Sequence, residues 1–423
     1  MSRLRKLQVL TNFIIGKDTD SMIEELGKFL KLRDKFLVSN LQNVSTGRDA
    51  AMANIKGKKH HEELTLKWNA DTNDSQVAKD VLENLQPHSS IKHLEIDGYC
   101  GTTFPDWLGN SLFCHLGYLR LSSCKYCFCL PALGQLMALQ SLEIVGMSCI
   151  SALTEDFYGD TRATMAFTSL KKLGIEKMPE LEKWHIPKYE VFNNLEELYI
   201  IDCPKLIGEL PQQCSSLRIL EISRCDSLVL PNGQLSIFNG NNIQQFTSLC
   251  DLKISNLKSL KGLCLELNQL VKLQRLSIVD CGSLLPFLPS YLPSSLKVLN
   301  YEGCCNLEVE SESCQLEDLA LVNYDSHKVM CLGAFPMLKS LEILNCKSTG
   351  IGSQNSGAAT SVMTSLQTLA ISGSVDLMSF PEGGLPAAPK LTQLHLWNCK
   401  KLKFLPQQMD YLFPSLRHLF ISC

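Results

Sequence analysis

Apolar residues recur in a fixed order along this chain of 423 residues, and short polar stretches separate them. The order is clearest in residues 195–228, where LEELYIIDCPKL is followed by LRILEISRCDSL. Leucine occupies the first and fourth positions of both segments, isoleucine the sixth and cysteine the ninth. Apolar residues two positions apart are typical of a short strand that buries one face. Each segment therefore predicts one strand whose fourth and sixth side chains point inward.

The same order recurs along the chain, mostly at intervals of about 20–25 residues, and it matches the leucine-rich-repeat template L-x-x-L-x-L-x-x-C/N-x-L. A single unit cannot bury its apolar face alone, so the units must stack. The pattern predicts an α/β fold: a curved leucine-rich-repeat solenoid with parallel strands on the concave face and loops and short helices on the convex face. Further units begin at Leu116, Leu139, Leu170, Leu249, Leu273, Leu296, Leu316, Leu338, Leu366, Leu391 and Leu416.

The N-terminal third is less regular than the rest of the chain. Residues 1–21 have the apolar spacing of a repeat's tail, and we expect them to form a partial preceding repeat. We expect residues 22–146 to form an N-terminal module of irregular helical repeats, and residues 147–423 to continue the array. No polar capping helix comes first, and the unit at 416–421 is cut short. The array is therefore expected to be truncated.

Local signals in the N-terminal module predict short helices between strands. Ser21 and Glu24 have the spacing of a capping box ahead of a short amphipathic helix. An alanine-rich stretch and a segment that ends before Pro87 predict two more helices. These two helices are expected at 49–55 and 76–85, and strands at 36–38 and 64–68.

The charge balance gives no reason to expect nucleic acid or a membrane as a partner. Lys and Arg number 40 against 43 Asp and Glu, so the formal net charge is -3. This balance provides no long-range steering toward polyanions, and no apolar run approaches transmembrane length. The cluster Lys56, Lys58 and Lys59 is interpreted as the solvated end of a helix.

The 19 cysteines are interpreted mainly as core residues of the repeats. Strands about 4.8 Å apart would permit bridges between adjacent turns, so the reduced state is inferred from the compartment. The N-terminus lacks the small-residue cleavage site of a signal peptide, which favours a reduced cytoplasmic or nucleocytoplasmic protein. Seven cysteines occupy the ninth position: Cys124, Cys203, Cys225, Cys281, Cys304, Cys346 and Cys399.

Residue groups that could support catalysis are scarce. Cys124, Cys127 and Cys129, with His115 upstream, have half the spacing of a zinc site, but no second Cys-x-x-Cys follows. No G-x-S-x-G turn is present, and the nine histidines are scattered. We therefore expect no catalytic residues, no cofactor and no metal, and we interpret the chain as a protein that is not an enzyme.

The predicted binding surface is the row of third, fifth and seventh positions, which point away from the buried ones. Aromatic and arginine side chains contribute most at protein interfaces. Acidic residues at the fifth position, such as Glu143 and Glu221, suit either a basic partner or simple solvation. At the C-terminal end of the array, recognition competes with edge packing as an explanation of the aromatic residues. The candidate partner-binding residues are Tyr118, Arg120, Tyr199, Ile201, His395, Trp397 and Phe420.

Several phrases of the sequence resemble one protein family. They are FLVSNLQNV, DAAMANIKGKKHHEELTLKW, GTTFPDWLG and LPALGQL in the N-terminal module, and EDFYGD, MPELEKW, CPKLIGELP, FPEGGLP and CKKLKFLP beyond it. Together they resemble the leucine-rich-repeat region of plant intracellular immune receptors of the coiled-coil NB-LRR type. The resemblance covers essentially the whole chain.

The resemblance implies recognition of a pathogen effector or of a host protein that an effector has altered. It also implies contact with the nucleotide-binding domain of a full receptor, which the repeats would restrain. No G-x-x-x-x-G-K-[ST] phosphate loop and no N-terminal heptad segment occur here, so nucleotide binding does not carry over. The chain is thus expected to be a fragment of a receptor or a truncated paralogue.

Two other classes of protein also use such repeats. The substrate-receptor arm of a ubiquitin ligase would need an F-box-like helical segment, for which residues 1–20 are too short. An extracellular receptor ectodomain would carry L-x-G-x-I-P turns in most repeats, whereas only LIGELP at 206–211 comes near. Both remain alternatives at this point.

Overall fold

The computed structural model divides into two compact units, unit 1 (Met1–Leu217) and unit 2 (Arg218–Cys423). Structure is described for residues 7–17, 22–29, 33, 35–71, 74–159, 165–187, 191–208, 210–211, 214–236, 246–263, 267–284, 292–304, 315–323, 335–345, 362–373, 387–405 and 407–422.

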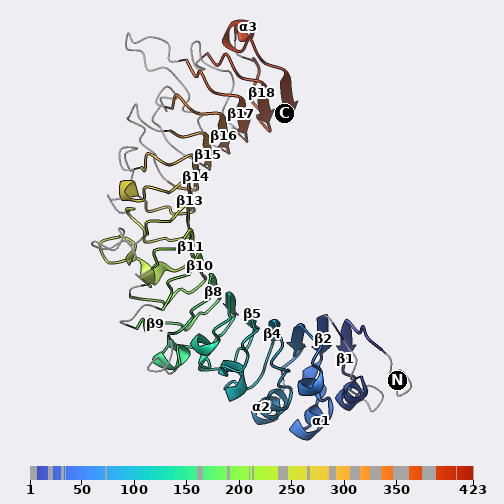
Figure 1. The fold of residues 1–423 in the computed structure, drawn as a ribbon. Helices are drawn as coiled ribbons and strands as arrows, with labels where there is room; N and C mark the ends of the chain where they lie inside the picture. Colours follow the sequence, from blue (N-terminus) through green and yellow to red (C-terminus); the bar gives the residue numbers. More distant parts are fainter. Residues whose placement is uncertain are drawn as a thin grey trace. The chain divides into compact units, whose positions relative to one another are not determined.

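Unit 1 contains a sheet of parallel strands, one from each repeat, that pair in chain order. The α-helices lie on the opposite side of the repeats from these strands (Figure 1). The strands are β1 (Asn12–Ile14), β2 (Lys35–Ser39), β3 (Glu63–Lys67), β4 (His93–Asp97), β5 (Tyr118–Ser122), β6 (Ser141–Val145), β8 (Lys172–Glu176) and β10 (Glu197–Ile201). The helices are α1 (Gly47–Met52), α2 (Ser75–Asn84) and the 3-10 turns η1 (Ile23–Lys28), η2 (Leu41–Asn43), η3 (Ile55–Gly57), η4 (Asp106–Gly109), η5 (Leu133–Gln135) and η6 (Glu155–Phe157).

Unit 2 repeats the same arrangement with parallel strands in chain order. The predicted leucine-rich-repeat fold is thereby confirmed. The strands are β11 (Ile219–Ser223), β12 (Asp251–Ser255), β13 (Arg275–Val279), β14 (Val298–Glu302), β15 (Asp318–Val322), β16 (Ser340–Leu344), β17 (Thr368–Ser372), β18 (Gln393–Trp397) and β19 (His418–Ser422). The helical turns are η7 (Asp226–Leu228), η10 (Leu267–Gln269) and α3 (Met409–Leu412).

The alternation of inward and outward side chains follows the sequence pattern. Leu198, Ile222 and Ile278 are fully buried, as expected for fourth and sixth positions. Parallel pairing aligns these positions between neighbouring strands, for example Ile254 with Ile278. Stacking therefore joins the apolar faces of successive repeats into one continuous core within each unit. The outward third, fifth and seventh positions form what we call the strand face.

The residue that follows a strand commonly has a left-handed backbone, a feature the leucine spacing alone did not predict. Glycine or asparagine often occupies this eighth position because both tolerate a positive φ. Gly98 has φ +69°, and a Cβ there would lie 2.3 Å from the Trp68 carbonyl oxygen. Lys177 takes the same conformation after β8 at φ 53°, despite its long side chain. The turn directs the chain from each strand toward the core at the ninth position.

Ninth-position cysteines lie inside the stack as predicted. The Cys124 thiol is buried and donates to the Ser122 carbonyl oxygen at 3.3 Å, with the Ile96 carbonyl of the preceding repeat at 3.9 Å. Burial raises the pKa of the Cys124 thiol, which keeps it protonated as a donor. Cys203, Cys225, Cys281, Cys304 and Cys399 are likewise buried. Cys346 lies outside the described residues.

The N-terminal module differs from the sequence prediction in two ways. Where a capping box was expected, η1 is a 3-10 turn with Met22 at its N-cap and no side-chain capping hydrogen bond. Ser21 itself lies outside the described residues. The helix expected at 49–55 ends at Met52, and the chain then forms the separate turn η3 after a left-handed residue, Asn54. By contrast, Asp74 caps α2 with hydrogen bonds from two backbone amides, close to the predicted start.

The prediction that Lys58 is solvated at the end of a helix is wrong, because this lysine is buried. Its side chain is 1% exposed, and Nζ donates to the carbonyl oxygens of Leu26 at 2.6 Å and Phe29 at 3.0 Å. These carbonyls lie at the end of η1, where the Leu26 oxygen also accepts a hydrogen bond from the Phe29 amide at 3.1 Å. Burial lowers the pKa of the Lys58 ammonium to about 8. The lysine thus ties η1 to the following repeat at some electrostatic cost.

This burial predicts a pH-dependent stability. Between pH of about 8 and about 10.5 the unfolded chain binds a proton at Lys58 that the folded chain does not, so stability rises with pH in this window. Urea unfolding across the window should show the wild type gaining about 2 kcal/mol relative to Lys58→Met. If the free energy of unfolding changed with pH in the same way for both proteins, the buried ammonium would be contradicted.

Two of the sequence phrases, EDFYGD and MPELEKW, lie on the side of unit 1 away from its strands, where aromatic side chains pack together. Trp184 Nε1 donates to Tyr158 Oη at 2.9 Å, and Tyr158 Oη donates to the His185 carbonyl oxygen at 2.9 Å. Phe167 and Phe192 stack nearby with ring centroids 5.5 Å apart. A short second sheet, β7 (Ala152–Leu153) and β9 (Lys183–Trp184), joins the same region. EDFYGD and MPELEKW are therefore packing motifs.

Candidate functional site: the strand faces

The strand faces place the seven candidate residues in two separate groups. Tyr118, Arg120, Tyr199 and Ile201 lie on β5 and β10 of unit 1. His395, Trp397 and Phe420 lie on β18 and β19 of unit 2. All seven occupy outward positions of their strands.

In unit 1, Glu143 of β6 is the centre of a charged cluster. Its Oε2 accepts a close hydrogen bond from Arg120 Nη1, and its Oε1 lies 2.9 Å from Lys172 Nζ of β8. Burial acts to raise the pKa of the Glu143 carboxyl, but Lys172 and Arg120 outweigh burial and hold the pKa below its usual value. The carboxylate therefore holds two cations in place across three adjacent strands.

Two tyrosines flank this cluster. Tyr118 Oη donates to Glu143 Oε2 at 3.3 Å, and burial raises the pKa of Tyr118. Lys172 Nζ lies 5.4 Å from the centroid of the Tyr199 ring, within the range of a cation–π contact. Ile201 is half-buried at the end of β10 and aligns with Glu176. The structure thus links Tyr118, Arg120 and Tyr199 through Glu143 and Lys172.

Lys172 was not among the sequence candidates, although strand register contained a signal for it. It stands at the third position of its repeat, as Tyr118 does, and pairs with Ser141 and Glu197 across β6, β8 and β10. Gly174, at the fifth position of the same strand, is buried between its neighbours but has no side chain of its own on the face. A Cβ there would meet only Glu176 Oε1 at 3.6 Å and Glu143 Cγ at 3.8 Å.

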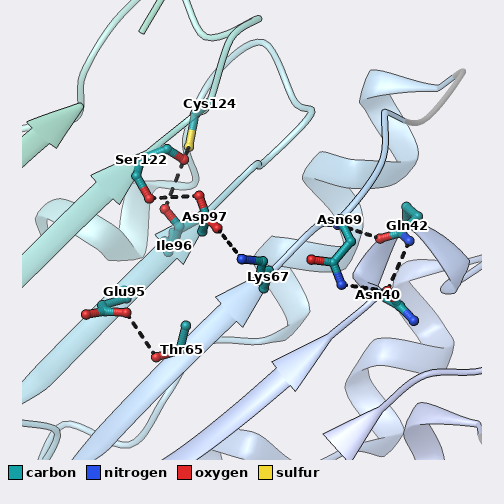
Figure 2. A network of polar contacts seen from close by, with 10 residues as sticks. All are labelled: Asn40, Gln42, Thr65, Lys67, Asn69, Glu95, Ile96, Asp97, Ser122 and Cys124. Atoms are coloured by element: carbon teal, nitrogen blue, oxygen red, sulfur yellow. Dashed lines mark hydrogen bonds and ion pairs between the residues drawn. The ribbon is translucent and has the colours of Figure 1, made fainter. Parts of the chain in front are cut away.

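Toward the N-terminus the strand face of unit 1 continues as a ladder of polar contacts between repeats (Figure 2). Lys67 Nζ lies 2.9 Å from Asp97 Oδ2, and Ser122 Oγ donates to Asp97 Oδ1 at 2.9 Å. Thr65 Oγ1 donates to Glu95 Oε2 at 3.3 Å. The Lys67–Asp97 ion pair is partly exposed and adds little stability, so the ladder mainly fixes side-chain positions.

The first strands of unit 2 show the same pairing of opposite charges. Lys253 Nζ lies 2.9 Å from Glu221 Oε1, and Arg275 Nε donates to Asp251 Oδ2 at 2.8 Å. Glu317 forms ion pairs with Lys297 and Lys339 on either side. The carboxylate of Glu221, considered above as a contact for a basic partner, is therefore paired with a lysine of the same chain.

At β18 and β19 the face becomes aromatic. The His395 and Phe420 rings stack with centroids 4.6 Å apart and an interplanar angle of 13°. Trp397 meets His395 edge-on at 5.1 Å, and His418 lies 6.2 Å from Phe420. Trp397 is 44% exposed and Phe420 is 47% exposed. The three predicted residues thus form one group, which we call the aromatic cluster, with His418 beside it.

Two of the three thiols considered for metal binding, Cys124 and Cys127, lie in the core. Cys127 Sγ donates to the Gly101 carbonyl oxygen at 3.1 Å, and burial raises the pKa of this thiol. Cys129 is exposed, and His115 lies beside Cys114 instead, with Nδ1 3.3 Å from Cys114 Sγ. Within the described residues, no group of three His, Cys, Asp or Glu side chains is placed to hold a metal ion. In the same ranges, no helix is long and apolar enough to cross a membrane.

Repeats with this register and this burial define a leucine-rich-repeat protein. Comparison with known proteins agrees: a family model described as R13L1/DRL21 leucine-rich repeats matches residues 23–147. The chain is 32% identical over 321 residues to a disease resistance RPP13-like protein 1 of Arabidopsis thaliana, covering 71% of this chain and 30% of that protein. It is 30% identical over 254 residues to disease resistance protein RGA2 of Solanum bulbocastanum, covering 52% of this chain and 26% of that protein.

The chain is therefore similar to the leucine-rich-repeat region of plant disease resistance proteins, as its phrases indicated. It spans less than a third of the length of either relative. The solved structure of the TLR13–ssRNA13 complex has a TM-score of 0.55 over 94% of this chain and 55% of that chain, at 14% sequence identity. That likeness concerns the fold alone.

Proposed function

We propose that this chain is the recognition module of a plant intracellular immune receptor. Its strand faces bind a pathogen effector or an effector-modified host protein, and its repeats restrain a nucleotide-binding domain in a full receptor. The similarity to disease resistance proteins is the observation that carries the proposal. The module acts by binding, without catalysis, in the reducing cytoplasm or nucleocytoplasm, which suits its free thiols.

The strand faces support a binding role because they present ordered side chains without serving the core. In unit 1, Arg120 and Lys172 are already held by Glu143, so binding there loses little additional side-chain entropy. Tyr118 and Tyr199 add aromatic area beside them. Such a preorganised cluster favours a protein surface of matching shape over a small molecule.

Gly174→Trp tests the strand face of unit 1 directly. Gly174 occupies an outward position of β8, and a Cβ there would lie at van der Waals distance from its nearest neighbours, so the indole should project from the strand face and away from the core. We expect the unfolding transition to stay within about 0.5 kcal/mol of wild type, while partner-dependent activity falls at least about tenfold. The assay is cell death in plant leaves, with the chain joined to the nucleotide-binding region of a matching relative and co-expressed with an effector panel.

Glu83→Trp is the matched control, because Glu83 is exposed on α2, on the side of unit 1 away from the strands. It should leave both stability and cell death unchanged. Absence of any effector-dependent response from the wild-type fusion would contradict the proposed function. An equal response from wild type and Gly174→Trp would contradict recognition by this face.

A further inference from the structure

The strand face of unit 2 changes its character between β16 and β18. Up to β16, cations on or next to the strands pair with carboxylates of neighbouring repeats, as in Lys339 with Glu317. The strands β17, β18 and β19 read TLAIS, QLHLW and HLFIS and contain no carboxylate. The carboxylates carried by the strands of unit 2 therefore end at β16, before the aromatic cluster begins.

Cationic residues outnumber carboxylates in the described segments that contain the aromatic cluster. Residues 387–405 and 407–422 contain five lysines and arginines but a single carboxylate side chain, that of Asp410. Lys390 and Arg417 precede β18 and β19, and Lys400 follows β18, so cations flank the strands at both ends. All three are exposed. These described segments thus carry a positive net charge, although the whole chain carries a net charge of -3.

The exposure of Trp397 is not an effect of the last strand. β18 pairs with β17 on one side and β19 on the other, so Trp397 has strand neighbours on both sides and is still 44% exposed. The inward positions of β19 behave differently: Leu419 and Ile421 are exposed on the face that a further repeat would cover. Edge packing could therefore bury Leu419 and Ile421 but would leave the indole on the strand face.

We propose that this part of the strand face binds an acidic polypeptide segment that carries an aromatic or large apolar side chain. The side chain packs on His395, Trp397 and Phe420, and the segment's carboxylates lie near Lys390, Lys400 and Arg417. Charge complementarity selects an acidic partner, and the exposed rings supply the apolar contact. This inference rests on the proposed function and specifies the chemistry of the partner that the receptor recognises.

Fluorescence anisotropy with the full chain tests the inference. The probes are three labelled synthetic peptides of equal length: one rich in Asp and Glu with a central Phe, one with Lys replacing the acidic residues, and one with Ala replacing the Phe. We expect the first to bind at least about tenfold more tightly than either variant, and its affinity to fall severalfold between about 50 and about 300 mM salt.

Variants distinguish the aromatic cluster from non-specific adhesion. Trp397→Ala and Arg417→Glu should each weaken binding of the acidic peptide at least about fivefold, whereas Glu83→Trp on the exposed side of α2 should not change it. Circular dichroism should show unchanged unfolding for Trp397→Ala, because the side chain is exposed. Equal binding of the acidic and lysine peptides, or no effect of Trp397→Ala, would overturn the inference.

Single-stranded RNA of mixed sequence is the remaining probe, because aromatic rings among cations also suit nucleic acid. Binding of RNA more tightly than the acidic peptide would overturn the inference as well. These outcomes are separable from the proposed function. An effector response that survives in plant leaves while the peptides fail to bind would reject only the acidic partner.

Discussion

Replacing Ile278 with aspartate is expected to unfold the repeats around β13. Ile278 is fully buried at the sixth position and aligns with Ile254 and Tyr301 in the neighbouring strands. A carboxylate at this position would lose its hydration inside the core and leave the space of the isoleucine side chain partly empty, which costs about 5 kcal/mol or more. Each repeat is stabilised by its neighbours, so the loss should spread to the adjacent repeats. Urea unfolding followed by circular dichroism measures the change.

Ser277→Asp is the control for this experiment, one residue away on the opposite face. Ser277 accepts a hydrogen bond from Asn300 Nδ2 at 3.3 Å and aligns with Lys253 of β12. A carboxylate there can keep the hydrogen bond and gains a cationic neighbour, so we expect a change within about 0.5 kcal/mol. Equal destabilisation by the two substitutions would show that the strand does not alternate as described.

Gly134→Ala is also expected to lower the free energy of unfolding strongly, because two repeats approach each other closely at this glycine. A Cβ at Gly134 would lie 2.4 Å from the Tyr158 carbonyl oxygen and 2.9 Å from Ala166 Cβ. Because the obstructing oxygen belongs to the backbone, the repeats must separate, which we expect to cost at least about 2 kcal/mol. The glycine in the phrase LPALGQL is thereby explained by packing.

Gly117→Ala is the matched control in the same unit. A Cβ at Gly117 would find its nearest neighbours at 3.9 Å, so the substitution should be close to neutral. Thermal unfolding of both variants provides the comparison. A stable Gly134→Ala protein would mean that η5 and the segment around Tyr158 are further apart than the structure places them.

The fold was predictable from sequence because one short rule repeats. Alternating Leu and Ile positions predict Leu198 and Ile222 as buried, and a recurring cysteine predicts an inward ninth position. These features depend on residues within a few positions of one another. The same local reasoning failed at Lys58, because its acceptors, the carbonyls of Leu26 and Phe29, lie about thirty residues away in sequence.

The candidate site was predictable only in part, for a similar reason. Outward aromatic and arginine residues such as Tyr118, Arg120 and Trp397 follow from position in the repeat. Their partners depend on strand register across repeats of unequal length, so the link between Arg120 and Lys172 through Glu143 required the structure. The positive surroundings of the aromatic cluster likewise emerge only when β18 and β19 are adjacent.

Hydroxyl-radical footprinting read out by mass spectrometry tests the central claim most directly, because it reports the exposure of each aromatic side chain in the intact chain. Strands that alternate as described should leave Trp397 and Phe420 readily oxidised and Tyr99 and Tyr301 protected, since the latter two are fully buried. Binding of a partner should then protect Trp397 or Tyr199 without changing Tyr301. Oxidation of Tyr301 as fast as that of Trp397 would contradict the stack of repeats and the strand face built on it.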